Sequence, residues 1–210
     1  MTPKQMSYKN TAETVIKEFA KRGIEAYYCE DSKAAVEQVL SMMEENSVVA
    51  SGGSMTLEES GIMDAVKGGN YTYIDRSVAK TPEEARVIYG KTVMADYYLM
   101  SSNAVTLDGQ LVNIDGNGNR VACLITGPKQ VIVVAGMNKL VTNVEEGINR
   151  VHNMAAPPNG MRLGLETPCA KIGKCADCLS KQSMCSQVVI TRMCKNDRIK
   201  VVLVGEELGF

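Results

Sequence analysis

The sequence predicts an α/β fold, with a Rossmann-like, mostly parallel sheet covered by helices on both faces. Two observations carry this prediction. Short apolar runs alternate along the chain with amphipathic segments of helical length, which is the pattern of βαβ units. The run Gln130–Ala135 (QVIVVA) is also apolar from its second residue on, as expected of a strand that is buried on both faces.

Helices are predicted where apolar residues recur at helical spacing between recognisable boundary residues. In the segment 8–22, Val15 and Phe19 share one face and Gly23 follows as a stop. The pair Thr81-Pro82, followed by two glutamates, is a cap, a first-turn proline and acids that oppose the helix dipole. The predicted helices are residues 8–22, 33–45, 81–95, 121–125 and 142–155, with a short one that opens at Thr56.

Strands are predicted in the short apolar runs between these helices. They cover residues 24–29, 47–50, 71–75, 97–100, 105–107, 110–114, 130–135 and 198–204. We expect Pro157-Pro158-Asn159-Gly160 to end the last long helix. Residues 160–196 then form an irregular, Cys-rich insertion before the final strand, and residues 1–210 form a single domain.

The composition excludes several classes of protein. At 210 residues and 45% hydrophobic residues, the chain can bury a substantial core. A net charge of −1 and a pI near 6.0 argue against nucleic acid or an anionic membrane as the main partner. No apolar run approaches the roughly 18 residues that a membrane span needs. The polar N-terminal stretch has no signal-peptide core, so we expect a cytoplasmic protein.

The first candidate site is the loop Ser51-Gly52-Gly53-Ser54, which joins a predicted strand to a predicted helix. Glycine lets a ligand approach the backbone closely, and backbone N–H groups at such a junction face outward. A phosphate or a carboxylate would suit it, with the hydroxyls of Ser51, Ser54 and Thr56 as further donors. A tight strand–helix turn with a serine cap explains the same residues.

The second candidate site is the loop Asn113-Ile114-Asp115-Gly116-Asn117-Gly118-Asn119. Two residues such as Asn-Gly are enough to reverse a chain, whereas this loop has seven. Its Asn and Asp side chains and free N–H groups suit a small polar ligand. We expect it to lie beside the 51–54 loop at one end of a parallel sheet, where open α/β folds bind ligands. A long surface turn is the alternative.

The third candidate site is a group of cysteines. Cys169, Cys175, Cys178 and Cys185 lie within 17 residues, and Cys194 follows and could substitute for Cys169. Four thiolates on an irregular loop would suit Zn²⁺ or an iron–sulfur cluster, which we take as the possible cofactor. The spacing matches no standard motif, however. A redox pair formed by Cys175 and Cys178, or a set of unligated loop thiols, remains open.

The central block resembles a known family. The glycine–serine loop, the stretch from Asn103 to Val141, Arg150, Ala155-Ala156-Pro157 and the ending from Val202 to Gly209 resemble the LUD-domain family of lactate-utilisation proteins. This family resembles in turn the ribose-5-phosphate isomerase, glucosamine-6-phosphate deaminase and CoA-transferase fold superfamily. The resemblance covers nearly the whole chain and implies the same α/β fold.

The resemblance also suggests ligand contacts and partners. The superfamily's enzymes use acids and a lysine, for which Asp108, Asp115 and Lys139 are the nearest counterparts, and we take these as ligand contacts only. Asn103, in the same block, is a further predicted ligand contact. Lys139 could equally lie along the surface. The resemblance further implies iron–sulfur oxidoreductase subunits as possible partners and a homodimer.

Two functions follow from these observations. In the first, the chain binds a small anionic metabolite or a phosphate-bearing cofactor and serves lactate or related organic-acid metabolism. In the second, the cysteine loop carries a metal cluster in an electron-transfer or assembly subunit. His152 is the only histidine, so no Ser/His/Asp or metal constellation can be built around it, and no residue is assigned a catalytic role.

Overall fold

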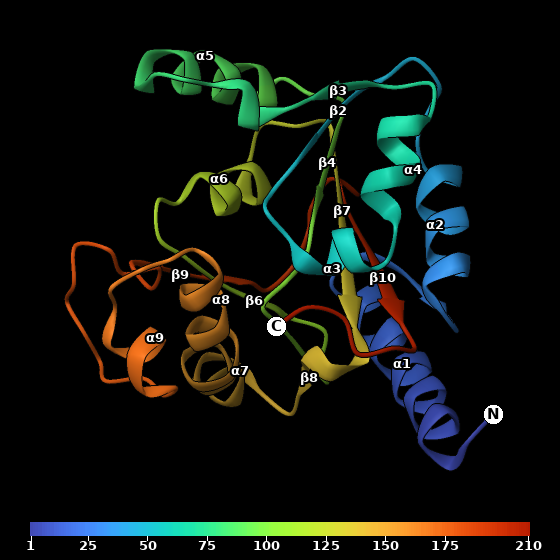
Figure 1. The fold of residues 1–210 in the computed structure, drawn as a ribbon. Helices are drawn as coiled ribbons and strands as arrows, with labels where there is room; N and C mark the ends of the chain where they lie inside the picture. The colour runs from blue at the N-terminus through green and yellow to red at the C-terminus, as the bar shows by residue number, and fades with distance from the viewer.

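The computed structural model describes residues 1–210, and its centre is a six-stranded parallel sheet, sheet A (Figure 1). The strands follow one another across sheet A in the order β1 (Glu25–Cys29), β10 (Ile199–Val204), β7 (Gln130–Gly136), β4 (Tyr97–Met100), β2 (Val48–Ser51) and β3 (Thr72–Ile74). Every neighbouring pair is parallel. This confirms the predicted mostly parallel sheet.

Helices cover both faces of sheet A, as predicted. Along β7, Ile132 and Val134 point into one buried cluster while Val131 and Val133 point into another, because successive side chains alternate between faces. The first cluster is closed by α2 (Ser32–Ser41), α3 (Met55–Glu59) and α4 (Ile62–Gly68). The second is closed by α1 (Pro3–Lys21) and α6 (Asn119–Ile125), and Figure 1 shows α2 and α4 side by side on the opposite face.

Capping residues set two of the helix boundaries. At α5 (Pro82–Val93), the Thr81 hydroxyl accepts a hydrogen bond from the Glu84 amide, as the cap signal predicts. Helix α1 begins earlier than predicted because Thr2 and Gln5 form a capping box. A single 3₁₀ turn, η1 (Arg76–Val78), precedes α5.

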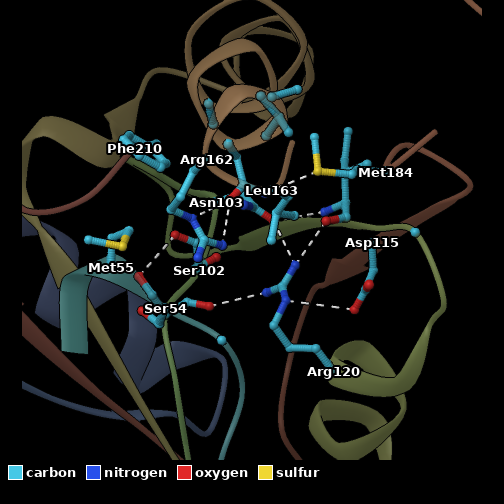
Figure 2. A pocket seen from close by; sticks show the side chains of 18 of the residues that line it. Ser54, Met55, Ser102, Asn103, Asp115, Arg120, Arg162, Leu163, Met184 and Phe210 are labelled. Carbon is cyan, nitrogen blue, oxygen red and sulfur yellow. Dashed lines mark hydrogen bonds and ion pairs between the residues drawn. The ribbon is translucent and has the colours of Figure 1, made fainter. Parts of the chain in front are cut away.

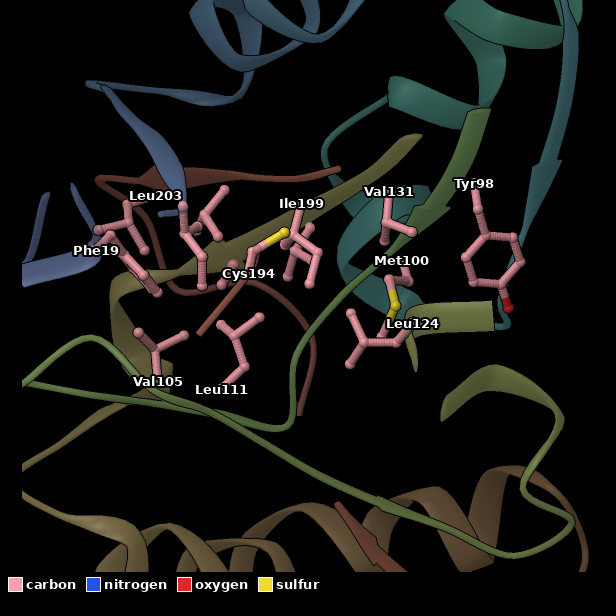
Figure 3. Close-up of a cluster of buried hydrophobic side chains, with 14 of the residues drawn as sticks. Phe19, Tyr98, Met100, Val105, Leu111, Leu124, Val131, Cys194, Ile199 and Leu203 are labelled. Atoms are coloured by element: carbon pink, nitrogen blue, oxygen red, sulfur yellow. The ribbon is translucent and has the colours of Figure 1, made fainter. Parts of the chain in front are cut away.

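The predicted strands at 105–107 and 110–114 do not join sheet A. They form β5 (Ala104–Thr106) and β6 (Leu111–Asp115) of a second sheet, sheet B, in the order β8 (Leu140–Val141), β5, β6, β9 (Gln187–Thr191). The connection between β5 and β6 is too short for a parallel crossover and allows only an antiparallel hairpin. Val105 and Leu111 pack with Phe19 and Leu203, so the two sheets share one core (Figure 3).

The prediction that Pro157-Pro158-Asn159-Gly160 ends a helix was wrong. After α7 (Val144–Arg150) the chain passes through a π-helical turn, η3 (Val151–Ala155), into α8 (Ala156–Arg162). Pro157 and Pro158 have no N–H to donate to the carbonyls one turn earlier, and their rings would clash with those carbonyls in a regular α-helix. The helix widens at this point, where the Ala156 amide donates to the Val151 carbonyl.

The expectation of an irregular segment at 160–196 was wrong in part. The segment contains α9 (Pro168–Ile172) and β9, which pairs antiparallel with β6 over its whole length. Between them the chain is irregular, as predicted. No helix in the structure is long and apolar enough to cross a membrane.

Candidate functional site

A cavity of about 280 Å³ opens where the strands of sheet A end (Figure 2). Residues that follow β2 and β4 line it, together with the end of β6 and residues of η3 and α8. The chain leaves β2 towards β3 on one side and later continues through β4, β7 and β10 on the other. The cavity therefore lies at the reversal of strand order, which is where open α/β sheets bind ligands.

Lys139 lies at the sheet end of this cavity. It belongs to the 3₁₀ turn η2 (Met137–Lys139) after β7, and only 4% of its surface is exposed. Its Nζ donates hydrogen bonds to the hydroxyls of Thr56 (2.7 Å) and Ser101 (3.0 Å). No carboxylate forms an ion pair with it. Burial, and then the positive charges of Arg150 and Arg120, lower the pKa of Lys139 from 10.5 to about 7.

Arg120, from α6, connects the two sheets beneath the cavity. Its guanidinium donates to the Asn113 and Asn103 side-chain oxygens at 2.6 and 2.8 Å, and to the carbonyls of Ser101 (3.2 Å) and Ile114 (2.9 Å). The dashed lines in Figure 2 show Arg120 reaching from α6 towards Asn103 and Asp115, whose Oδ2 is 3.7 Å from Arg120 Nε. Burial lowers the pKa of Arg120 below its usual value.

Arg150 fixes the segment that carries Lys139. Only 7% of its surface is exposed, and it donates to the carbonyls of Asn138 (3.1 Å) and Asn103 (2.7 Å). Both acceptors are backbone groups, so no carboxylate compensates the positive charge of the guanidinium. Arg150 therefore holds η2 against the β4–β5 connection and adds positive potential behind the cavity.

The balance of charge in the cavity is positive. Three arginines line it, Arg76, Arg120 and Arg162, against the single carboxylate of Asp115, which already faces Arg120. Gly53 gives Arg76 its place, because a Cβ there would come within 2.4 Å of Arg76 Nη2. An arrangement with this excess of cationic groups attracts an anion.

The final residues of the sequence fold back over the Lys139 side of the cavity. Leu208 accepts from the Thr56 hydroxyl (3.1 Å), and the Gly209 amide donates to Glu59 (2.6 Å). Gly209 has a positive φ of 60°, and a Cβ there would lie 2.7 Å from Thr56 Oγ. Only glycine combines this backbone conformation with so close an approach. Phe210 then lines the cavity.

The structure brings most of the predicted ligand contacts together, which leaves their role a prediction. The residues of that set that line the cavity are Gly53, Ser54, Thr56, Asn103, Asp115, Gly116, Asn117 and Lys139. The loop expected at 113–119 is shorter than predicted, since Asn113 to Asp115 belong to β6 and Asn119 opens α6. It also follows a strand of sheet B, whereas the 51–54 loop follows a strand of sheet A. The two loops therefore reach the cavity from different sheets.

Five predicted contacts lie outside the cavity. The Ser51 hydroxyl meets that of Tyr73 at 2.9 Å, and Gly52 lies against Tyr98 and Arg120. Gly118 caps α6 in the left-handed conformation.

The other two have side-chain partners. Asn113 is fully buried, where it accepts from Arg120 and donates to the Ser102 hydroxyl. Asp108 lies at the β5–β6 turn and accepts from Arg22 at 2.7 Å, which lowers its pKa together with the stronger effect of the Thr106 hydroxyl.

The four cysteines of the predicted metal site do not form one in this structure. No group of three or more His, Cys, Asp or Glu side chains is placed to hold a metal ion. Cys169 is buried beside the Thr167 hydroxyl, the Cys175 amide donates to Asn153, and Cys185 lines the cavity. Cys194 is buried in the shared core and does not replace Cys169. Burial, and then the nearby thiols of Cys169, Cys175 and Cys178, raise the pKa of Cys185 to about 11, and a shared role of the four stays a prediction.

Sequence reasoning missed the arginines of the cavity. Arg76, Arg120 and Arg162 come from a 3₁₀ turn, α6 and α8, and no local pattern connects them. Arg120 offered one signal, because it directly follows the polar loop at the start of a predicted helix. Met184 and Phe210, which also line the cavity, offered none.

Comparison with known families matches residues 12–204 to the LUD domain. The chain belongs to the LUD-domain family. A crystal structure of a DUF162 family protein from Deinococcus radiodurans matches this LUD-domain chain with a TM-score of 0.52 and 12% identity, over 95% of this chain and 98% of that one. At this identity the likeness shows the shared fold alone.

Two further structures match this LUD-domain chain more weakly. The eIF2B delta structure from Chaetomium thermophilum has a TM-score of 0.36 and 18% identity, over 52% of this chain and 48% of that one. The tetrameric eIF2B-beta2-delta2 complex from C. thermophilum has a TM-score of 0.43 and 14% identity, over 84% and 56%. A comparison with curated proteins found no match.

Proposed function

We propose that this LUD-domain protein binds a small anionic metabolite in the cavity between sheet A and α8. The observation that carries the proposal is the charge of the lining, with three arginine side chains against one carboxylate that already has a partner. Arg76 and Arg162 are exposed at the opening, where they can pair with an anion without losing existing ion pairs.

The size of the cavity favours a small ligand. Its volume of about 280 Å³ is at the lower end of the range for small-molecule sites. A carboxylic acid of a few carbons, or a sugar phosphate, fits this volume better than a whole dinucleotide or coenzyme A. Among phosphate-bearing ligands, we therefore favour a sugar phosphate over a larger cofactor.

The resemblance to lactate-utilisation proteins directs the choice of ligand to organic acids. Lactate and its oxidised form pyruvate each carry one carboxylate for a guanidinium and one oxygen at the next carbon. The polar end of the cavity, where Lys139 lies between the hydroxyls of Thr56 and Ser101, is the region that this oxygen and its carbon would face. A role in lactate or related organic-acid metabolism follows as part of the proposal.

Isothermal titration calorimetry with lactate, pyruvate, ribose 5-phosphate and coenzyme A tests the proposal. We expect at least one of the small anions to bind the wild type. The variant Arg162→Gln should weaken that binding by about tenfold, the loss of one charge-assisted hydrogen bond. Arg162 is exposed and contacts only Asn159 through its guanidinium, so its replacement leaves the fold intact.

Arg86→Gln is the matched control. Arg86 is equally exposed on α5 but does not line the cavity, so this variant should bind as the wild type does. Absence of binding by every anion, or equal weakening by Arg162→Gln and Arg86→Gln, would contradict the proposed site.

A further inference from the structure

We propose that Lys139 acts as an uncharged nucleophile that forms an imine with the carbonyl carbon of a small anionic aldehyde or ketone. This inference rests on the proposed function, because the anion-binding cavity must first hold the substrate. It adds a covalent step and a substrate class, an anion that also carries a free carbonyl group.

The hydrogen bonds around Nζ define the orientation of the amine. Its two partners are the hydroxyls of Thr56 and Ser101. Each hydroxyl already donates its own proton elsewhere, Thr56 to the Leu208 carbonyl at 3.1 Å and Ser101 to the Ser102 carbonyl at 3.3 Å. A hydroxyl has one proton, so towards Lys139 both can only accept.

An uncharged amine satisfies this arrangement completely. A neutral –NH₂ group has two N–H donors, one for each hydroxyl, and its lone pair points away from both. A protonated –NH₃⁺ group has a third N–H, for which no protein group is within hydrogen-bond distance, and no carboxylate forms an ion pair with it. Burying such an unpaired charge is costly.

Two neighbouring cations act in the same direction, and their effect exceeds the opposite one of the Glu59 carboxylate. Arg150 and Arg120 lie near enough to repel a proton on Nζ, and with burial they lower the pKa of Lys139 to about 7. A substantial fraction of the amine is therefore neutral near neutral pH. Lysines activated as nucleophiles by burial and by a neighbouring cation share these two features.

Lys139 lines the cavity that the cationic groups also line, so the amine and the anion site share one space. A guanidinium at the opening would hold the carboxylate or phosphate of the substrate and direct its carbonyl towards Nζ. Arg162 lines the cavity from α8, and Arg76 lines it from η1 beside Gly53, so either guanidinium could take this role.

The step balances without a further reactant. The Nζ lone pair attacks the carbonyl carbon, the C=O π pair moves to oxygen, and a proton passes from nitrogen to that oxygen to give a carbinolamine. Loss of the second nitrogen proton with the hydroxyl group releases water and leaves a C=N bond. Carbon is neither oxidised nor reduced, so no redox partner is needed.

Borohydride trapping tests the inference. Wild-type protein is incubated with pyruvate or, separately, with ribose 5-phosphate, and sodium borohydride then reduces any imine to a stable secondary amine. We expect an intact mass higher by one reduced substrate residue, and proteolytic mapping should place it on Lys139. A pyruvate adduct identifies an oxo acid as the substrate, and an adduct with ribose 5-phosphate alone identifies a sugar phosphate.

Two lysine variants complete the design. Lys139→Arg should form no adduct, while Lys129→Arg, which replaces an exposed lysine paired with Asp96, should form it as the wild type does. Because the adduct is mapped on the wild type, the test holds even if Lys139→Arg fails to fold.

Other outcomes separate this inference from the proposed function. Binding of either anion by calorimetry with no adduct at Lys139 would overturn the inference and leave the binding site in place. Labelling of exposed lysines as extensive as that of Lys139 would overturn it as well. Absence of both binding and adduct would overturn both proposals.

Discussion

The two walls of the cavity are built in different ways. The inner wall consists of buried or half-buried side chains that are held by hydrogen bonds, namely Thr56, Ser101, Arg120 and Lys139. The outer wall, formed by Arg162, Leu163 and Met184, consists of side chains from α8 and its neighbouring loop, and the first two are exposed.

This difference suits the two walls to different roles, the inner one to reaction and the outer one to ligand recognition. A group that reacts must be held within a fraction of an ångström, and hydrogen bonds from rigid strands and helices achieve this. A surface that accepts ligands of different size benefits from side chains that can move. In the proposed function, the inner wall therefore supplies the reactive groups, and the outer wall selects the anion.

Arg120→Met should produce the largest effect, because it removes the centre of the inner wall. The side-chain oxygens of Asn103 and Asn113 and the carbonyls of Ser101 and Ile114 would lose their shared donor. We expect the free energy of unfolding to fall by about 3–5 kcal/mol, as for other disrupted buried charge networks. Urea denaturation measures it. A loss below about 1 kcal/mol would show that the inner wall is not rigidly held.

The stability of the wild type should depend on pH through Lys139. Since its pKa falls from 10.5 in the unfolded chain to about 7 in the folded protein, the folded state binds fewer protons between these values. Its free energy of unfolding should therefore rise with pH across this window, by up to about 1.4 kcal/mol per pH unit relative to Lys139→Met, and the difference should level off below it.

Urea titrations of the two proteins at a series of pH values provide the comparison. All other groups titrate in both, so only the difference between the two profiles reports on Lys139. Parallel profiles would mean that the amine keeps its charge when folded, which would also remove the basis for a neutral nucleophile.

Gly209→Ala should have an intermediate effect on the inner wall. Alanine is strained at the positive φ of this position, and its Cβ would lie 2.7 Å from Thr56 Oγ. We expect a loss of about 1–2 kcal/mol, measured by thermal unfolding. Gly164→Ala is the control, since Gly164 also has a positive φ but nothing lies within 4 Å of the added Cβ. An equal loss in both would attribute the effect to the backbone alone.

Leu163→Ala should have the smallest effect on stability and a larger one on selectivity. Leu163 is 48% exposed, so its truncation should cost less than about 1 kcal/mol. We expect a wider opening to improve binding of ribose 5-phosphate relative to pyruvate, measured by calorimetry. Unchanged relative affinities would show that the outer wall does not select by size.

Sheet A could be predicted from the sequence because each of its strands is a short apolar run between clear breaks. Gln130–Ala135 is the strongest example, and β7 differs from it by one residue. Sheet B could not be assembled in the same way. Its strand β9 is partly exposed, and β8 has two residues, so neither gives the periodic signal of a buried strand.

The residues of the cavity also fall into those that the sequence predicts and those that it does not. Gly53, Ser54 and Asp115 stand in short polar loops after apolar runs, so local sequence predicts their place. The environment of Lys139 depends on residues from distant segments, since Thr56, Ser101 and the tail near Gly209 bury it only in the folded chain. The same holds for the arginines, whose convergence depends on the packing of sheet B and α8 against sheet A.

The position of β10 in sheet A affects the stage of folding at which the cavity forms. This strand lies between β1 and β7, and Glu25 pairs with Lys200 across most of the chain length. Contacts so distant in sequence form late, because closing so long a loop costs entropy before any pairing compensates for it. The residues after β10 then bury Thr56 and Lys139. During synthesis, the reactive amine thus acquires its environment only after the sheet has closed, and an unfinished chain has no such amine to offer to metabolites.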